Sequence, residues 1–150
     1  MTKSLPAGEV AAAIKARFPD AVADAQGSTV WVKSASLAEV CRFLRDDASL
    51  AFDFLALLTA ADYIDYFEVV YQLTSLRKNH RLVLKTRAYN RDNPVVPSVY
   101  GVWRGANLME REVYDLMGVR FEGHPMLKRI LTWDGFEGHP LRKDFLLQRP

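Results

Sequence analysis

The spacing of apolar residues first predicts two amphipathic helices near the N-terminus. Residues 9–18 carry an apolar residue every four positions and end at Pro19, as is typical of a short helix with one buried stripe. Residues 37–44 show similar spacing. Ser36 lies directly before this second run and Glu39 lies within it. The two form a capping-box pattern, in which each side chain accepts a free N–H of the first turn. We therefore expect two short helices that share a core.

Extended segments follow from alternation and from short apolar runs. A hairpin is predicted where two β-prone runs are separated by Gln26-Gly27, because glycine tolerates the positive φ of a tight turn. Residues 52–59 are almost continuously apolar, which is typical of a strand covered on both faces. The predicted strands are residues 21–25, 28–32, 52–59, 67–73 and 81–89. Short connections favour an antiparallel meander, so we predict an α+β fold with a small, mainly antiparallel sheet flanked by helices.

A further helix is predicted over residues 107–118. Asn107 suits the N-cap, and Gly118 suits the left-handed position after the last turn. Asp115 is anomalous, because a carboxylate in the last turn faces the negative end of the helix dipole and costs up to about 1 kcal/mol. Arg111, or a cation from elsewhere in the fold or from a partner, would compensate. Asp115 is therefore expected to have a tertiary or functional role.

The bulk composition limits the classes of function. The chain has 150 residues, 49% hydrophobic and 25% charged residues, and a formal net charge of +2, which suits one soluble domain and gives no general attraction to nucleic acid. The basic segment 77–91 has six basic and no acidic residues, and is read as a solvated strand face or, alternatively, a surface for an acidic partner. His80 within it is expected at the surface. The single cysteine, Cys41, is expected to be buried and excludes a Cys-ligated cluster. We expect neither a signal peptide nor a membrane span.

The pentapeptide Phe-Glu-Gly-His-Pro occurs twice, at residues 121–125 and 136–140. One interpretation is a metal site built from His124 and His139 with nearby carboxylates, although the fifteen-residue separation does not make a local site. The other is a pair of fixed elbows, because glycine permits a bend and proline holds the preceding histidine extended. On the second reading, residues 1–120 form the α+β domain and residues 121–150 an extended, irregular docking segment of the same unit.

The second half of the chain resembles a known family. The run from residue 96 to residue 145, with its Glu-Arg-Glu, Tyr-Asp, Gly-His-Pro and Leu-Lys-Arg-Ile-Leu motifs, resembles the C subunit of bacterial NADH:quinone oxidoreductase, the counterpart of the 30-kDa subunit of respiratory complex I. Residues 66–73 and 81–85 are also similar to strands of that family. Leu108 and Trp133-Asp134 depart from its usual residues.

The resemblance implies a subunit without catalytic, cofactor-binding or metal-binding residues of its own. FMN, iron–sulfur clusters and quinone would be carried by partner subunits, chiefly the quinone-site D subunit and the terminal-cluster B subunit. The chain would lie at the cytoplasmic face of the bacterial membrane as a peripheral subunit that binds no nucleic acid. The positions expected in partner docking are Glu110, Arg111, Glu112, Tyr114, Asp115, Gly118, His124, Pro125, Leu127, Arg129, Ile130, Leu131, Gly138, His139, Pro140, Arg142, Lys143, Asp144 and Phe145.

Three alternatives stay open on the sequence. Related ferredoxin-dependent or hydrogenase-like membrane complexes contain similar subunits, so the electron donor is not fixed. An independent His-ligated metalloenzyme is a second alternative, and nucleic-acid binding by the basic segment 77–91 is a third.

Overall fold

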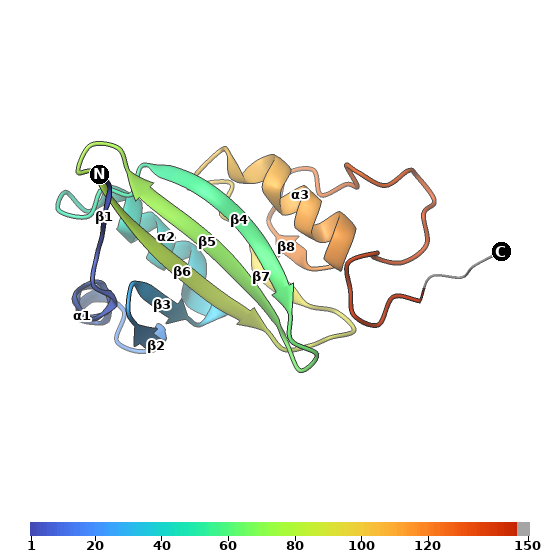
Figure 1. Cartoon of the computed structure of the whole chain (residues 1–150), viewed down its shortest axis with the longest axis horizontal. Coiled ribbons are helices and arrows are strands. Elements are labelled where there is room, and N and C mark those ends of the chain that lie inside the picture. Colours follow the sequence, from blue (N-terminus) through green and yellow to red (C-terminus); the bar gives the residue numbers. More distant parts are fainter. Residues whose placement is uncertain (147–150) are drawn as a thin grey trace.

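A long antiparallel meander forms the centre of the fold, which is described by a computed structural model covering residues 1–146 (Figure 1). The helical elements are α1 (Ala7–Arg17), the 3-10 turn η1 (Ser34–Ser36), α2 (Leu37–Asp46) and α3 (Ala106–Met117). The strands are β1 (Lys3–Ser4), β2 (Val22–Gln26), β3 (Thr29–Val32), β4 (Phe54–Asp62), β5 (Phe67–Ser75), β6 (His80–Ala88), β7 (Val95–Pro97) and β8 (Arg120–Glu122). No helix within residues 1–146 is long and apolar enough to cross a membrane.

The large sheet has the strand order β2-β3-β6-β5-β4, and β1 also pairs with β6. Strands β4, β5 and β6 are antiparallel neighbours, which confirms the predicted meander and the α+β class. The β2–β3 hairpin is also confirmed, with Gly27 at a φ of +58° in its turn. It joins the meander in parallel, with Trp31 opposite Lys85, because α2 carries the chain from one edge of the sheet to the other.

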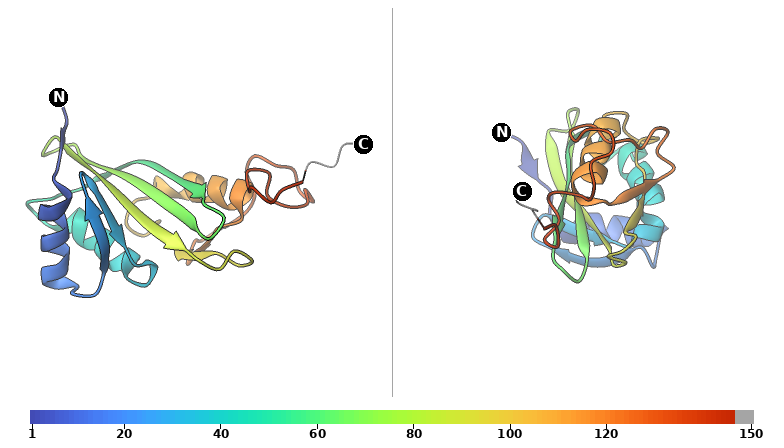
Figure 2. Two further views of the ribbon diagram at one scale, coloured as in Figure 1. Left: turned by 60° about the horizontal axis from the view of Figure 1, so that its bottom comes forward. Right: turned by 90° about the vertical axis from the view of Figure 1, so that its right-hand side faces the viewer.

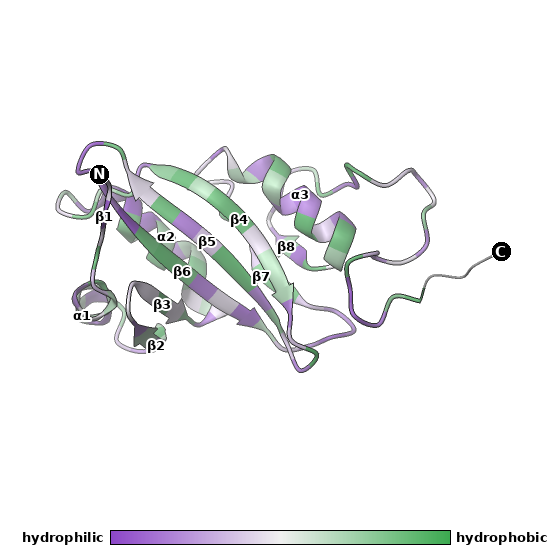
Figure 3. Ribbon diagram, in the orientation of Figure 1, coloured by the Kyte–Doolittle hydropathy of each residue, from purple (hydrophilic) through white to green (hydrophobic). Residues whose placement is uncertain are grey.

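Helices cover one face of this sheet, and within residues 1–146 no helix covers the other. Figure 2 shows the long strands on one side and α2 on the other, and in Figure 1 α2 lies behind the sheet. The strands β5 and β6 alternate apolar and polar residues accordingly (Figure 3). The largest fully buried side chains beneath the covered face include Ile14, Leu37, Leu44, Phe52, Phe67, Tyr71, Leu73, Leu82 and Leu84. We call the uncovered side the outer face.

The prediction that residues 52–59 are covered on both faces is wrong. The strand β4 lies at the edge of the sheet and alternates, with Leu55 and Leu58 buried while Phe54 and Leu57 are 47% and 40% exposed. An apolar run arises here because the outward-facing positions of the edge strand are apolar as well.

The two predicted N-caps have different outcomes. Ser36 is the N-cap of α2, as predicted, but it has a helical conformation and makes no side-chain capping bond, because a side chain caps well only from an extended backbone. The third helix begins one residue before Asn107, with Gly105 at its N-cap, and the Asn107 Oδ1 is buried without a hydrogen-bond partner among residues 1–146. The predicted left-handed end at Gly118 is confirmed, with a φ of +76°.

Two further predictions concern the exposure of Cys41 and His80, and only the first is confirmed. Cys41 is fully buried, as predicted, and burial raises the pKa of its thiol. The prediction that His80 lies at the surface is wrong, since the residue is 7% exposed. Its Nε2 lies 2.6 Å from the Leu50 carbonyl oxygen, and its ring packs against Phe52 at 4.9 Å between centroids. The loop that follows α2 folds over the start of β6 and removes this histidine from water.

A second, two-stranded sheet marks where the chain leaves the body of the fold. The strands β7 and β8 are parallel, and Phe121 in β8 is only 2% exposed. After Glu122 the chain runs through turns alongside and beyond α3 as far as residue 146 (Figure 1). The C-terminal segment predicted from residue 121 therefore begins inside β8, and residues 147–150 lie outside the described residues.

Candidate functional site

Asp115, near the C-terminal end of α3, organises the segment that follows β8. Its Oδ2 accepts hydrogen bonds from the backbone N–H groups of the next turn, at 3.0 Å from Ile130, 2.7 Å from Leu131 and 2.8 Å from Thr132. Its Oδ1 accepts from the Arg129 guanidinium at 2.9 Å and from the Thr132 hydroxyl. The expected tertiary role of Asp115 is confirmed, and its compensating cation is Arg129.

The electrostatics of this carboxylate follow from its partners. The Asp115 side chain is inaccessible to solvent. Burial alone would raise its pKa, but the hydrogen bonds from Thr132, Leu131 and Ile130 outweigh burial and hold the pKa well below its usual range. Asp115 is therefore charged in the folded chain and fixes the turn at residues 129–132, which we call the latch turn.

Two arginines tie the latch turn to its surroundings. Arg111 donates from Nε to the Lys128 carbonyl at 3.0 Å and from Nη2 to the Arg129 carbonyl at 3.1 Å. The prediction that Arg111 compensates Asp115 directly is therefore wrong. Arg129 donates to the Gly138 carbonyl at 2.9 Å and so connects the latch turn with the second pentapeptide. One guanidinium holds the turn on α3, and the other holds the two halves of the segment together.

The two histidines lie at opposite ends of α3. His124 Nε2 lies 3.2 Å from the Asn107 carbonyl oxygen, and its Nδ1 accepts the Met126 N–H at 3.0 Å. His139 Nδ1 donates to the Asp115 carbonyl at 2.9 Å. Since Asn107 and Asp115 are eight residues apart, about 12 Å along the helix, the imidazoles do not converge on one ion. Residues 1–146 contain no cluster of three or more side chains arranged to hold a metal ion.

The second pentapeptide packs closely on the end of α3. A Cβ on Gly118 would lie 2.7 Å from Cδ2 of His139, so glycine is required there both for its positive φ and for the approach of the imidazole. Phe145 stacks on Phe136 with 6.0 Å between centroids and lies close to Gly138. These contacts order the segment as far as Phe145.

A second group of charges fastens the far end of the segment to the sheet. Arg91 makes a bidentate contact with Asp62, at 2.8 Å for each N–O pair, and also donates to Asp144 at 3.1 Å. The Lys143 N–H donates to Asp62 at 2.9 Å, and Arg142 donates to the Arg91 carbonyl at 2.9 Å. Hydrogen bonds from Arg91 hold the pKa of Asp62 well below its usual range. We call this group the clasp.

Glu110, also on α3, has a different environment from Asp115. Its side chain is fully buried, and it accepts hydrogen bonds from the Ser98 hydroxyl at 2.7 Å and from the Val99 N–H at 2.8 Å. Burial raises its pKa to about 7. Glu110 therefore secures the loop after β7.

Several apolar side chains of the segment stay exposed although its backbone is fixed. Leu131 is 64% exposed, Trp133 70% and Leu141 60%. Leu127 packs against the core and Ile130 is half-buried. The other predicted positions differ in their exposure. Tyr114 lies against His139 with 6.0 Å between ring centroids, Pro140 is half-buried, and Glu112 and Pro125 are exposed.

The sequence prediction missed three contributors to this arrangement. Arg91 and Asp62 are separated by 29 residues, and Thr132 stands outside every motif. The only signal for Arg91 was its place in the basic segment 77–91, where nothing indicates its partner. Asp62 interrupts an apolar run, which could have marked it as a buried charge that needs a cation.

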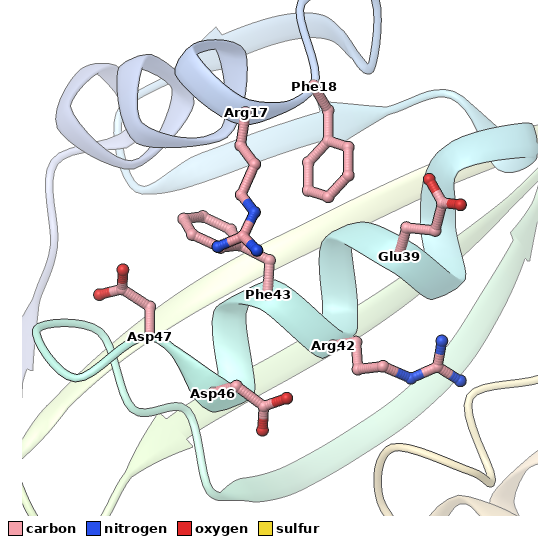
Figure 4. A pocket seen from close by; sticks show the side chains of 7 residues that line it. All are labelled: Arg17, Phe18, Glu39, Arg42, Phe43, Asp46 and Asp47. Atoms are coloured by element: carbon pink, nitrogen blue, oxygen red, sulfur yellow. The ribbon is translucent and has the colours of Figure 1, made fainter.

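A separate hollow of about 350 Å³ lies between α1 and α2 (Figure 4). Phe18 and Phe43 line it, with Arg17 stacked on the Phe43 ring at 5.5 Å. Two of its carboxylates are already used, since Asp46 pairs with Arg45, and Asp47 accepts hydrogen bonds from the loop after α2. This hollow therefore offers few free groups to orient a ligand.

Comparison with known proteins identifies the family. Residues 30–150 match the sequence model described as respiratory-chain NADH dehydrogenase, 30 Kd subunit. The NADH-quinone oxidoreductase C subunit of Roseiflexus sp. (strain RS-1) is 44% identical in an alignment of 138 residues that covers 87% of this chain and 79% of the relative. The corresponding subunit of Cupriavidus metallidurans is 50% identical in an alignment of 126 residues that covers 78% of this chain and 63% of the relative.

A solved structure has the same fold. A chain from the membrane-bound sulfane sulfur reductase, an archaeal respiratory membrane complex, superposes with a TM-score of 0.75 at 25% identity, covering 93% of this chain and 85% of that chain. The family match covers the long strands, α3, the latch turn and the clasp. The chain therefore belongs to the family of the 30-kDa subunit of respiratory-chain NADH dehydrogenase, whose bacterial members are named as the C subunit of NADH-quinone oxidoreductase.

Proposed function

We propose that this chain is a non-catalytic subunit in the peripheral arm of a proton-translocating NADH:quinone oxidoreductase. In this role it scaffolds the quinone-site subunit and the terminal-cluster subunit while electrons pass from NADH to quinone. FMN, iron–sulfur clusters and quinone are carried by partner subunits, and the chain lies at the cytoplasmic face of the membrane. Family membership and the geometry of the C-terminal segment support this proposal.

The observation that carries the proposal is the contrast between a fixed backbone and exposed apolar side chains. Asp115 and Arg129 form their hydrogen bonds within the chain, so their role is to fix the conformation of the segment. Leu131, Trp133 and Leu141 project from that shape into water. Ordering apolar groups without burying them is unfavourable in isolation and is typical of a surface that a partner covers.

Substitution of the exposed leucines tests this docking surface. We expect a Leu131→Ser, Leu141→Ser double variant to leave the fold intact, because both side chains are at least 60% exposed. If each leucine is buried at the partner and contributes about 1.5 kcal/mol, incorporation into the complex falls by roughly a hundredfold. The measurement is the amount of the quinone-site and terminal-cluster subunits that co-purifies with the tagged variant expressed in place of the natural chain.

A matched control separates docking from general surface polarity. Leu76 is 70% exposed but lies in the turn between β5 and β6, at the opposite end of the sheet from the segment. The Leu76→Ser variant should assemble normally. Normal assembly of the double leucine variant, with full NADH:quinone activity, would contradict the proposal.

The structural neighbour supports a second candidate, an equivalent subunit in a related respiratory membrane complex that uses another electron donor. Its observation is the TM-score of 0.75 to a chain of the sulfane sulfur reductase complex. The 44–50% identity with NADH-quinone oxidoreductase subunits favours the first candidate. Identification of the subunits that co-purify, together with an assay of NADH-dependent quinone reduction, distinguishes the two.

A further inference from the structure

A hollow of about 350 Å³ opens on the outer face of the sheet, at the end of β3 and far along the chain from the C-terminal segment. Its walls include Trp31, Lys33, Arg87 and Tyr89. Arg87 belongs to the basic segment 77–91, in which only Arg91 has a role in fixing the proposed docking segment. The basic segment therefore forms part of the wall of this hollow.

The charges around this hollow do not balance. Glu68 is the central carboxylate, and it pairs with Lys85 and Arg87, each at 3.2 Å, while also accepting the Trp31 indole N–H at 3.1 Å. One carboxylate shared by two cations leaves one positive charge, and Lys33 at the rim adds another. Asp24, also at the rim, carries a negative charge and, within the described part of the chain, accepts hydrogen bonds only from neutral groups, the N–H of the next residue and a glutamine side chain two positions on, so the named groups have a net charge of +1.

The cations are also held in place by aromatic rings. Lys85 lies 5.3 Å from the centroid of the Trp31 ring, and Arg87 lies 4.6 Å from that of Tyr66. Tyr89 packs against Tyr66 at 5.6 Å and is 66% exposed. Tryptophan, tyrosine and arginine are the residues most enriched among those that dominate interface energetics, and fixed side chains lose little entropy on binding.

The backbone beside the hollow changes from strand pairing to a turn. The pairing of β3 with β6 ends at Trp31 and Lys85, whereas β5 continues to pair with β6 as far as Ala88. Among residues 1–146 no strand pairs with β6 beyond Lys85 on the side of β3, and the 3-10 turn η1 contacts β6. A bound segment would therefore be held by the side chains that line the hollow.

We propose that this hollow binds an extended acidic segment of a partner polypeptide. One carboxylate of that segment lies between Arg87 and Lys33, where positive charge is in excess, and a neighbouring apolar side chain lies between Trp31 and Tyr89. The proposal uses residues outside the latch turn and the clasp and holds independently of the docking function above. Nucleic acid fits less well, because a phosphate backbone would meet only a short basic strip on a chain of net charge +2.

Titration of the isotope-labelled full chain with a short peptide of alternating glutamate and tyrosine tests the proposal by NMR. We expect saturable, salt-sensitive shifts of the Trp31 indole N–H and of the backbone N–H groups of Arg87 and Tyr89. Arg87→Gln and Tyr89→Ala should each weaken binding about tenfold. The matched control Arg81→Gln, on the same strand and face, should change binding by less than about twofold.

Specific outcomes would overturn this assignment. Equal weakening by Arg81→Gln would show general charge attraction, and equal binding of a glutamine–tyrosine peptide would remove the need for carboxylates. A thymidine oligonucleotide that binds more tightly and displaces the peptide would assign the surface to nucleic acid. Concentration-dependent shifts of the same signals without peptide would assign it to a second copy of this chain. The spectrum of Tyr89→Ala also reports whether the fold is intact.

Discussion

Replacement of Asp115 by asparagine tests whether the latch turn is held mainly by this side chain. The substitution keeps the size of the side chain but removes its charge. In one orientation of the asparagine amide, its oxygen accepts from the three backbone N–H groups. Its NH2 group then faces the Arg129 guanidinium, and two hydrogen-bond donors oppose each other. The opposite orientation turns the NH2 group toward the backbone N–H groups instead. Either way at least one buried charge-assisted contact is lost, for which we expect about 3 kcal/mol.

The cost falls on the latch turn, because its other links to α3 do not use the Asp115 carboxylate: Arg111 donates to the Lys128 and Arg129 carbonyls, and Arg129 also donates to the Asp115 carbonyl. Three kilocalories per mole corresponds to an increase of roughly a hundredfold in the opening of this turn. Native-state hydrogen exchange of the amides of residues 130–132 measures this opening directly. Amides in β5 and β6 should keep their protection, because the hydrogen-bond partners of the Asp115 carboxylate lie in the latch turn.

Asp134→Asn provides the matched control. Asp134 is exposed, has no side-chain hydrogen bond within residues 1–146, and lies two residues after the latch turn. The control removes the same charge from the same segment and should leave exchange at residues 130–132 unchanged. Unchanged protection in Asp115→Asn, or equal loss in both variants, would refute the reasoning. Loss of protection throughout the chain would show that Asp115 supports the whole fold instead.

Three further predictions follow from buried groups. Glu110 keeps its proton in the folded chain up to about pH 7 but loses it near 4.5 when unfolded, so its contribution is fully present below 4.5 and is lost as pH rises through 7. The free energy of unfolding of the unsubstituted chain, measured with urea, should therefore decline by about 3 kcal/mol between those pH values because of Glu110, and Glu110→Gln should lack this decline. An unchanged decline in the variant would contradict the assignment. Gly118→Ala should destabilise the chain by about 1 kcal/mol more than Gly123→Ala, because both sites have positive φ but only the first approaches His139, and thermal melts compare them. Cys41 should react with a thiol reagent only as fast as the chain unfolds, since it is inaccessible; rapid labelling of the native chain would contradict its burial.

Local sequence patterns predicted much of the fold because they depend on neighbouring residues. The helix around residues 107–118 and its left-handed end at Gly118 follow from spacing and from the conformational freedom of glycine. The misplaced charge of Asp115 predicted a compensating cation, from Arg111, from elsewhere in the fold or from a partner, and Arg129 of this chain supplies it. A residue that violates a local rule was here an informative one.

The predictions that failed depend on tertiary contacts. His80 lies in a polar sequence, but the loop after α2 covers it. The Ser36 capping pattern is overridden because the chain enters α2 through a 3-10 turn. The clasp joins Asp62, Arg91 and Asp144, and no spacing rule relates positions so far apart. Their partnership is set by the way the sheet and the C-terminal segment are folded together.

The clasp and the latch turn together close residues 129–144 into a loop that is fixed at both ends. Its start is fixed on α3, and its far end is fixed beside Asp62. A partner that meets such a loop does not have to pay for ordering it, so recognition is expected to proceed as the meeting of two rigid bodies. The heat-capacity change of association should then reflect only the area that becomes covered, without the additional change that accompanies folding upon binding.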